Sequence, residues 1–417
     1  MRLTNSAAFS CTTFSEASAA SEGFSRDVAI LGGCGRVGLP LGVALASRGL
    51  TVTLHDFNLA AVETVNAGRL PFREKGAEGP LRRAVQEGRL VASPNPSTLS
   101  TAEYVVIVIG TPVDEHLNPD VDVVPRVIDD YASYLADGQL IILRSTVPPG
   151  VTKLVELTLA SRGVRAEVAF CPERLAEGNA MTELFDLPQM VAARDQDVRM
   201  RAEKLFLNLT ARVVHLTPEE AELAKLFTNA WRYVKFAMAN QFWMIANDAG
   251  LDFEPIRHAV TVDYPRAADL PRAGFAAGPC LLKDTMQLAA FSGNAFALGH
   301  AAMMVNEGLP LYLVEKLQAR YDLANMTVGI LGMAFKGGSD DARDSLSYRL
   351  RKLLRMRAKD TLCSDEYIAN NSFVGMEELL RRSDLAIVAA PHPEYRDLVT
   401  DIPVADLWGI TGRGVLI

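Results

Sequence analysis

The sequence predicts an α/β protein in three parts: a doubly wound parallel sheet, a region built on one long helix, and a second, smaller α/β domain. From Asp27 onward, short β-branched apolar runs alternate with helical stretches, which is typical of a parallel sheet with crossover helices. One long amphipathic stretch interrupts this alternation, and strand-like runs return after it. The chain of 417 residues is also too long for one typical core.

Four short apolar runs predict strands of the first sheet. They are Val28–Leu31, Leu50–His55, Tyr104–Ile109 and Gln139–Leu143. Each is short and rich in β-branched residues, as strands buried on both faces of a parallel sheet are. We expect this domain over residues 27–210. The Ser- and Ala-rich residues 1–26 lack the features of a secretory signal, and we expect them to form a disordered leader.

A long helix is predicted from Thr217 to about Asn247, within a central helical region over residues 211–323. The segment Thr217 to Glu220 combines an N-cap residue, a proline in the first turn and two acidic residues that favour the positive end of the helix dipole. Such a helix can bridge two domains or pair across a dimer. A broad apolar stripe follows at helical spacing and comprises Leu223, Leu226, Phe227, Ala230, Trp231, Val234, Met238, Phe242 and Ile245.

Strand-like runs return near the C-terminus, at Thr327–Leu331 and Leu385–Ala389, with helical stretches between them. This return of the alternating pattern predicts a second α/β domain over residues 324–417. The sequence shows no internal repeat of short period that would suggest a different architecture.

Composition and charge limit the classes of partner. The formal net charge is −8, from 42 lysines and arginines against 50 aspartates and glutamates. This argues against a nucleic-acid-binding protein but permits a local basic pocket for one phosphorylated ligand. No apolar run approaches the ~20 residues of a membrane span, so we expect no membrane partner.

The cysteines predict neither disulfides nor a zinc site. Cys11, Cys34, Cys171, Cys280 and Cys363 are odd in number, scattered and without CxxC spacing. The six histidines are also dispersed, without the spacing of metal ligands, so we expect no metal. A reducing compartment, the cytoplasm, is the natural location.

A glycine-rich turn follows the first strand and opens a helix. Gly33 to Gly38 (GCGRVG) has the form G-x-G-x-x-G, whose glycines allow a tight turn and the close approach of a pyrophosphate to the helix start. Asp56 ends the second strand, where it can accept from ribose hydroxyls, and no Arg or Lys follows it. This favours NAD over NADP; the alternative is a purely structural turn. The expected cofactor-binding residues are Gly33, Gly35, Arg36, Val37, Gly38, Asp56, Thr111, Pro112 and Thr146.

Lys225 and Asn229 lie four residues apart on the long helix, so both project from one face. An ammonium and an amide one turn apart can stabilise an oxyanion. The alternative is a solvated polar face of the helix.

A loop of small residues, Gly274 to Asp284 (GFAAGPCLLKD), places Cys280 at a predicted helix start beside Lys283. Both features lower the pKa of a thiol, so we expect a reactive thiolate. The alternative is a buried cysteine that acts as a small apolar residue. Asp284 is either a catalytic group or a partner of the helix dipole.

Two loops that follow strands add polar groups at the carboxyl edge of the sheet, where ligands gather. Arg144 to Gly150 (RSTVPPG) contains Thr146, and Cys171 to Gly178 (CPERLAEG) contains Glu173 and Glu177. Either glutamate could instead be a surface residue without a role, and these residues alone leave both interpretations open.

These motifs occur together and in one order. They are GCGRVGLPL (Gly33–Leu41), STVPPG, CPERLAEG, the helix with Lys225 and Asn229, GFAAGPCLLKD, and LGMAFKGGSDDARDS (Leu331–Ser345). From about Asp27 to the C-terminus, the chain resembles the UDP-glucose/GDP-mannose dehydrogenase family. The resemblance implies an N-terminal Rossmann domain that binds NAD, a central helical dimerisation region, and a C-terminal Rossmann-like domain that holds a nucleotide sugar.

The resemblance also implies a reaction: a four-electron oxidation of a sugar C6 hydroxyl that uses two NAD per turnover. Cys280 would attack the intermediate aldehyde to form a thiohemiacetal, which is oxidised to a thioester and then hydrolysed to the uronic acid. The catalytic residues it implies are Cys280, Lys225, Asn229, Asp284, Glu173 and Thr146, with Lys225 and Asn229 facing the oxyanion, Asp284 and Thr146 holding a water, and Glu173 as the base for hydrolysis. The substrate-binding residues it implies are Glu177, Lys225, Asn229, Arg266, Lys336 and Arg343, with Arg266 reaching the diphosphate of a neighbouring subunit.

Three positions depart from the family pattern without removing a reacting group. Arg36 replaces a common tyrosine beside the cofactor, Ala277 replaces a glycine, and Leu346 replaces a proline. Arg174 resembles family members that act on N-acetylated sugars, whereas residues 175–178 resemble the UDP-glucose type. The substrate class therefore stays open between UDP-glucose and UDP-N-acetylhexosamines, and the nucleotide base is not fixed.

Two other functions fit parts of the sequence. A two-electron dehydrogenase of the hydroxy-acid type also pairs a Rossmann domain with a helix that bears Lys and Asn four residues apart, but it needs neither Cys280 nor a second α/β domain. A non-catalytic dinucleotide-sensing protein would keep the fold without the chemistry. The yield of NADH per sugar and the effect of replacing Cys280 distinguish these alternatives.

Overall fold

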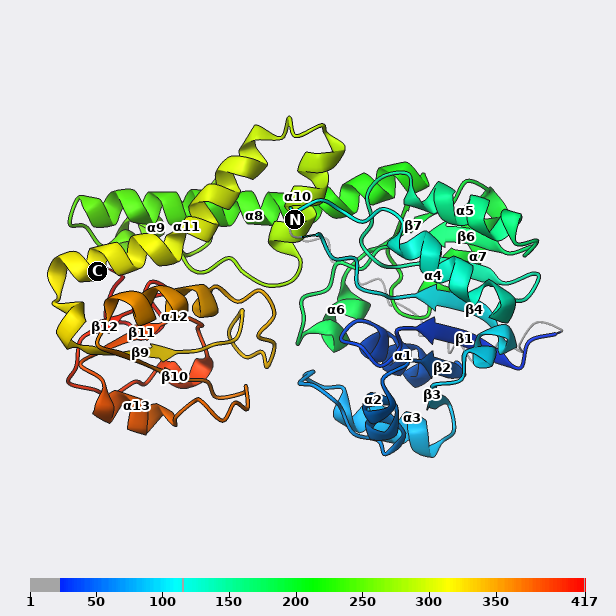
Figure 1. The fold of residues 1–417 in the computed structure, drawn as a ribbon. Helices are drawn as coiled ribbons and strands as arrows, with labels where there is room; N and C mark the ends of the chain where they lie inside the picture. Colours follow the sequence, from blue (N-terminus) through cyan, green and yellow to red (C-terminus); the bar gives the residue numbers. More distant parts are fainter. Residues whose placement is uncertain (1–22, 115, 416) are drawn as a thin grey trace, which may run out of the picture.

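The computed structural model describes residues 23–114, 116–415 and 417, and it contains two sheets joined by a group of central helices (Figure 1). The first sheet has the strand order β3-β2-β1-β4-β5-β6-β7-β8, with every pairing parallel except β6 with β7. Its strands are β1 (Arg26–Leu31), β2 (Val52–His55), β3 (Leu90–Ser93), β4 (Ala102–Ile107), β5 (Leu140–Leu143), β6 (Glu167–Phe170), β7 (Gln189–Ala192) and β8 (Val213–Leu216). The doubly wound sheet predicted from the sequence is confirmed.

Alternate residues of the strands supply two cores, one on each face of this sheet. Val28 and Ile30 of β1 pack with the helix after the glycine-rich turn, whereas Ala29 and Leu31 pack with helices on the other face. The helices of this domain are α1 (Gly38–Ser47), α2 (Leu59–Asn66), α3 (Glu78–Gln86), α4 (Val123–Tyr131), α5 (Val151–Ser161), α6 (Ala180–Asp186) and α7 (Gln196–Phe206), with 3-10 turns η1 (Pro96–Thr101) and η2 (Ala132–Tyr134).

The first sheet reaches a few residues beyond the expected domain 27–210 at both ends. Strand β8 lies beyond residue 210 and pairs with β7, so the sheet runs to Leu216. At the other end, the Ser25 N–H donates to Thr101 O at 3.0 Å and β1 begins at Arg26, so the last residues of the expected leader join the sheet. Residues 1–22 of that leader lie outside the described residues.

The predicted long helix is confirmed as α8 (Pro218–Asp248). Thr217 and Glu220 form a capping box: the Glu220 N–H donates to Thr217 Oγ1 at 3.4 Å, and the Thr217 N–H donates to Glu220 Oε2 at 2.8 Å. Figure 1 shows α8 running past both sheets, so it connects the two domains along one side of the molecule. The other central helices are α9 (Phe253–Thr261), α10 (Leu281–Phe291) and α11 (Ala297–Arg320).

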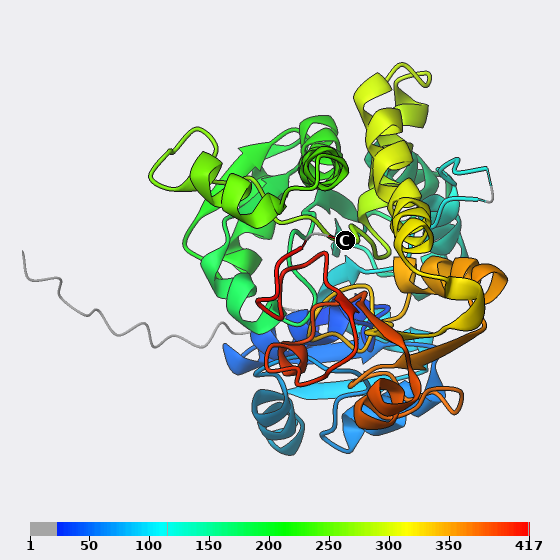
Figure 2. The ribbon, with the colours of Figure 1, turned by 90° about the vertical axis from the view of Figure 1, so that its left-hand side faces the viewer.

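The second sheet has the order β10-β9-β11-β12 and is parallel throughout. In Figure 2, which looks roughly along α8, it lies in front of the first sheet. Trp243 of α8 belongs to its core and donates from Nε1 to Val415 O at 2.9 Å, which ties the C-terminal segment to α8. The elements are η3 (Leu323–Asn325), β9 (Thr327–Leu331), α12 (Leu346–Arg357), β10 (Asp360–Ser364), α13 (Met376–Arg382), β11 (Leu385–Val388), η4 (Pro393–Tyr395) and β12 (Val404–Ala405).

Within the described part of the chain, no helix has both the length and the apolar character that crossing a bilayer requires.

Candidate active site

The glycine-rich turn between β1 and α1 has the geometry of an anion site. A side chain at Gly33 would place its Cβ 2.7 Å from Leu54 Cβ, and one at Gly38 would lie 2.6 Å from Gly32 O, so both glycines are required by packing. At Gly35 the nearest atom would be Gly32 O at 3.4 Å, which leaves room for a ligand to approach the backbone. No side chain caps the start of α1 at Val37, so this helix end can receive a pyrophosphate.

Asp56 and Thr111 lie at the neighbouring strand ends. Asp56 follows β2, and its Oδ2 accepts from the Cys34 N–H at 3.1 Å, so the carboxylate faces the glycine-rich turn. Thr111 follows β4 and is buried; it donates from Oγ1 to Thr146 O at 2.6 Å. Pro112 beside it is exposed. These residues fit the adenosine and nicotinamide sides of a dinucleotide that lies across the carboxyl ends of the strands.

Cys280 is the N-cap residue of α10 and its side chain is exposed. The loop before it packs against the second domain. Gly278 has φ +99°, and a Cβ there would lie 2.5 Å from the Phe335 ring, so only glycine fits. Ala277, one residue earlier, needs no such freedom, because positive φ is confined to Gly278 and Gly274 in this loop. The departure at Ala277 is therefore tolerated.

A compact polar cluster surrounds the start of α10. Asp284 is fully buried in the first turn of this helix, and its Oδ2 accepts from Asn229 Nδ2 at 2.5 Å, while its Oδ1 lies 2.5 Å from Lys283 Nζ. Lys225 and Asn229 of α8 are both buried. A solvated polar face, the alternative for these two residues, is therefore wrong. Buried polar groups of this kind hold one another in fixed positions.

The pKa of Cys280 contradicts the sequence-based expectation of a lowered value. Partial desolvation by the surrounding protein raises the pKa of this thiol above its ordinary value, and the nearby Asp284 carboxylate raises it further. Lys225 and Lys283 act in the opposite direction, but Lys283 is paired with Asp284, which offsets its charge. A thiol whose pKa is raised in this way requires a base when it reacts.

The other described cysteines lie in less reactive positions. Cys34, Cys171 and Cys363 are buried and unpaired, and burial raises the pKa of both Cys34 and Cys171 to about 12. Cys280 is thus the exposed thiol among the described residues, and it is the one that faces the polar cluster.

The loop after β6 places Glu173 and Glu177 in different surroundings. Glu173 accepts from the Leu175 N–H and is close enough to influence the Cys280 thiol. Arg174 between them donates to Pro188 O, so its side chain braces its own domain. Glu177 lies at the border with the second domain, where its Oε1 accepts from Ser339 Oγ at 3.0 Å.

The remaining predicted residues divide into two groups. Lys336 donates to Glu177 O, and Arg343 lies near enough to the Cys280 thiol to be influenced by it, so both face the site from the second domain. Arg266 is exposed after α9, where a guanidinium nitrogen lies 3.4 Å from the Tyr264 hydroxyl. Among the described residues, Arg266 forms no hydrogen bond or ion pair with Cys280 or with the polar cluster at the start of α10.

Several further residues build this site. Glu74 is buried and accepts from the N–H groups of Gly178 at 3.0 Å and Ala180 at 2.8 Å, which fixes the end of the Glu177 loop. Asp340 and Asp341 pair with Arg36 across the two domains. Asp340 and Asp341 lie within the motif Leu331–Ser345, but the pairing of these acids could not be read from the sequence, because their partners are far away in the chain.

A buried carboxylate and imidazole hold the loop that carries Lys336. Asp365 Oδ2 accepts from Met333 N at 2.6 Å and from Ala334 N at 2.9 Å, and it lies 3.0 Å from His392 Nε2. His392 Nδ1 accepts from the Gly338 N–H at 3.0 Å. Because both side chains are 0% exposed, the pair fixes both ends of residues 333–338.

This pair predicts a pH-dependent stability. Burial alone would raise the pKa of Asp365, but hydrogen bonds from His392 and from backbone N–H groups outweigh it and lower the pKa to about 2. The ionised carboxylate then contributes roughly 2 kcal/mol above its unfolded pKa, and this contribution is lost as the pH falls through about 2. Asp365→Asn should lower the unfolding temperature at about pH 6, and the difference from wild type should shrink toward about pH 2.5. Calorimetry at both pH values measures it.

Asp360→Asn is the control, because Asp360 is an exposed aspartate at the start of β10, the strand that precedes Asp365. This substitution should change the unfolding temperature little at either pH. A difference between Asp365→Asn and wild type that stays the same at both pH values would contradict the prediction.

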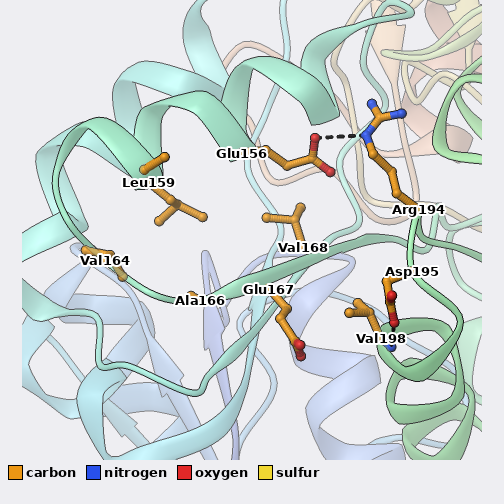
Figure 3. Close-up of a pocket in the computed structure, with 10 residues that line it drawn as sticks. Glu156, Leu159, Val164, Ala166, Glu167, Val168, Arg194, Asp195 and Val198 are labelled. Atoms are coloured by element: carbon orange, nitrogen blue, oxygen red, sulfur yellow. Dashed lines mark hydrogen bonds and ion pairs between the residues drawn. The ribbon is translucent and has the colours of Figure 1, made fainter.

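A separate cavity of about 230 Å³ lies between α5, β6 and α7 (Figure 3). Arg194, its cation, is already paired with Glu156 at 2.9 Å. Neither Cys280 nor any residue of the polar cluster at the start of α10 lines this cavity. Among the described residues no group of three or more His, Cys, Asp or Glu side chains is arranged to hold a metal ion.

Comparison with known proteins matches the chain to one family along most of its length. Residues 26–210 match the NAD binding domain of the UDP-glucose/GDP-mannose dehydrogenase family, residues 219–308 match its central domain, and residues 329–412 match its UDP binding domain.

Relatives that match over nearly the whole chain differ in the sugar that their names give. A UDP-N-acetyl-D-mannosamine dehydrogenase from Pyrococcus horikoshii is 29% identical over 384 residues, covering 89% of this chain and 90% of the relative. An NDP-N-acetyl-D-galactosaminuronic acid dehydrogenase from Ralstonia nicotianae is 27% identical, covering 88% and 92%. The solved structure of a UDP-glucose dehydrogenase from Pyrobaculum islandicum is 28% identical, with a TM-score of 0.84 and coverage of 94% and 96%.

Proposed function

The chain belongs to the UDP-glucose/GDP-mannose dehydrogenase family, and on this premise we propose that it oxidises the C6 hydroxyl of a nucleoside-diphosphate hexose to the carboxylate through a thioester on Cys280. It is an NAD-dependent nucleotide-sugar dehydrogenase. The observation that carries the thioester is the exposed Cys280 at the start of α10, beside the buried cluster of Lys225, Asn229 and Asp284.

NAD is the cofactor, and when bound it accepts the hydride in each of the two oxidations. The open backbone at Gly35 and the uncapped start of α1 at Val37 would hold its pyrophosphate, with Gly33 and Gly38 shaping the turn. Asp56 would accept from the ribose hydroxyls. Thr111, Pro112 and Thr146 would border the nicotinamide side, because they follow β4 and β5 at the same edge of the sheet.

Cys280 divides the oxidation of the aldehyde into two easier steps. Its sulfur forms a bond to C6 while the thiol proton leaves, and the aldehyde oxygen becomes the hydroxyl of a thiohemiacetal. Loss of hydride and of the hydroxyl proton gives a thioester. Water then attacks C6, the C–S bond breaks, and the uronic acid and the thiol are released.

The polar cluster supports each of these steps. The Lys225 ammonium and the Asn229 amide stabilise negative charge on the C6 oxygen. Because the pKa of Cys280 is raised, the thiol needs a proton acceptor, and the Asp284 carboxylate beside it is suited to that role. Asp284 and Thr146 would hold a water near C6, and Glu173 would act as the base that activates water for hydrolysis.

The second domain would bind the nucleotide sugar. Lys336 and Arg343 face the border between the domains and would contact the substrate, while Glu177 would orient the sugar. Arg266 would reach the diphosphate in a neighbouring subunit, which fits its exposed position after α9. The substrate is of the UDP-glucose or UDP-N-acetylhexosamine class, and the names of the relatives include both.

A panel of nucleotide sugars tests this function. UDP-glucose, UDP-N-acetylglucosamine, UDP-N-acetylmannosamine, GDP-mannose and dTDP-glucose are each incubated with the protein and NAD, and NADH and the sugar product are measured. We expect two NADH for each uronic acid formed. One NADH per sugar with an accumulating aldehyde or ketone would favour a two-electron dehydrogenase, and no turnover with any sugar would favour a non-catalytic dinucleotide-sensing protein.

The protein would act in the cytoplasm as a homodimer. The four described cysteines are free thiols, which suits a reducing compartment. One side of α8 leaves Phe227, Trp231, Phe242 and Ile245 between 42% and 59% exposed, while Leu226 and Ala230 on the other side are buried. A row of large apolar side chains on one helix is a surface that a second copy of this chain would cover.

Trp231→Glu should therefore weaken the dimer. A charge in the middle of an apolar interface should raise the dissociation constant by at least about 30-fold. Sedimentation equilibrium measures the monomer fraction against concentration. Met356→Glu on α12 is the matched control, because Met356 is 74% exposed but does not belong to the α8 row. A wild-type protein that is monomeric at micromolar concentration would rule out the dimer.

A further inference from the structure

Arg36 lies in the glycine-rich turn of the first domain, but its guanidinium points to the second domain. Its Nη1 is 2.7 Å from Asp340 Oδ1 and 3.0 Å from Glu177 Oε1, and its Nε is 3.6 Å from Asp341 Oδ2. The sequence predicts that Arg36 contacts the cofactor. In the structure the backbone of Arg36 belongs to the cofactor turn, whereas its side chain bridges two domains.

Other contacts strengthen the same bridge. Asp340 Oδ2 accepts from the Arg73 N–H at 2.9 Å, and the Arg73 guanidinium lies 3.8 Å from the centre of the Tyr367 ring. Arg73 belongs to the segment between α2 and α3, while Asp340 and Tyr367 belong to the second domain. In Figure 1 this segment faces the second domain on the side away from α8. The domains are thus joined along α8 and, separately, through Arg36 and Arg73.

The pairs of Arg36 are sheltered from water. The side chain of Arg36 is 21% exposed, and those of Asp340, Glu177 and Asp341 are 18%, 15% and 4% exposed. Ion pairs at such depth are screened less by solvent than pairs on the surface. Arg343 of the second domain also pairs with Asp341 at 2.5 Å and lies 3.8 Å from Glu177, so Arg36 is the cation that the first domain adds to this group and the one that holds Asp340.

We propose that Arg36 is a positioning residue that holds the cofactor turn against residues 339–341 of the second domain, so that the two nucleotide sites are aligned before either ligand binds. The inference rests on the proposed function only where it assigns the sugar nucleotide to the second domain. A ligand that contacts both sides binds only the molecules whose domains are together. With Arg36 in place, most molecules have their domains together. Without Arg36, the first ligand to bind must bring the domains together, and the second ligand then binds more tightly.

This leads to a coupling that can be measured. In the wild-type protein, NADH and UDP should bind nearly independently, because the domains are already aligned. In Arg36→Gln, the dissociation constant of each ligand alone should rise about tenfold, and each ligand should then strengthen the binding of the other by up to the same factor. If Arg36 acted only through contacts with the cofactor, Arg36→Gln would weaken the binding of NADH and leave the binding of UDP unchanged.

Isothermal titration of NADH and of UDP, each with and without saturating amounts of the other, tests the proposal. Asp340→Asn should produce the same pattern to a smaller degree, because Asp341 of the second domain remains a partner of Arg36. The double variant should be little weaker than Arg36→Gln, because both changes break the Arg36–Asp340 pair and the amide oxygen of the new asparagine can still accept from the Arg73 N–H. Arg82→Gln is the matched control: it removes an arginine of the same domain whose partner, Glu78, is a surface residue one helical turn away.

The outcomes are distinct. Parallel losses of affinity for both ligands, with new coupling between them, support the proposal; a loss for NADH alone, or for neither ligand, overturns it. Should Arg36→Gln fold poorly, Arg36→Lys and Asp340→Asn provide the same comparison, and small-angle scattering of these variants should show a larger radius of gyration. Because only binding is measured, these results stand whether or not the panel of sugars reveals turnover.

Discussion

Cys280→Ala should abolish the formation of uronic acid while leaving a folded protein that still binds NADH. Without the sulfur no thioester can form, and loss of a covalent nucleophile lowers kcat by at least about 10⁴-fold. Folding should be unaffected, because Cys280 is exposed and its removal leaves no cavity in the core. Mass spectrometry of the sugar products and NADH absorbance measure the effect.

Replacing a different cysteine tests whether the effect is specific to Cys280. Cys363→Ala removes a buried cysteine of the second domain, and it should cost some stability but leave the NADH yield per sugar unchanged. Cys280→Ser keeps the size of the side chain and should also fail to release acid. Full turnover by Cys280→Ala would end the thioester mechanism, whatever the sugar.

Lys225→Met should lower kcat by about 10² to 10³-fold, the range expected when one stabilising donor of an oxyanion is lost. It should also shift the reactivity of the cysteine. Lys225 is a positive charge that lowers the pKa of Cys280, so its removal should raise that pKa further. The rate of alkylation of Cys280 by iodoacetamide should therefore rise at a higher pH in the variant than in the wild type.

Lys235→Met tests whether this effect is specific. Lys235 is on the same helix but pairs with Asp269 near the surface, at 3.1 Å. Its replacement should change neither kcat nor the pH at which Cys280 becomes reactive. An unchanged alkylation profile in Lys225→Met would show that this lysine does not act on the thiol.

Features encoded by neighbouring residues could be predicted from the sequence. The glycine-rich turn and the cap of α8 depend on a few adjacent residues, and their predicted form agrees with the structure at Gly33, Gly38, Thr217 and Glu220. The parallel sheet follows from the repeated alternation of strands and helices. Each of these signals is complete within a short stretch of chain.

Features that depend on distant partners could not. The pKa of Cys280 is set by burial and by the pairing of Lys283 with Asp284, and neither can be read from a cysteine beside a lysine. Arg36 is 141 residues from Glu177 and 304 residues from Asp340 in the sequence. The direction of the Arg36 side chain depends on how the two domains pack, which the sequence near Arg36 does not indicate.

The continuity of α8 restricts how this enzyme can be altered. Asn229 lies in the polar cluster at the start of α10, while Trp243 on the same helix is anchored in the core of the second domain. One residue inserted between them would turn the far half of the rod by about 100° relative to the near half. A chimaera that replaces the part of the chain beyond this segment must therefore keep the residue count between Asn229 and Trp243, or the second domain will be rotated relative to the first.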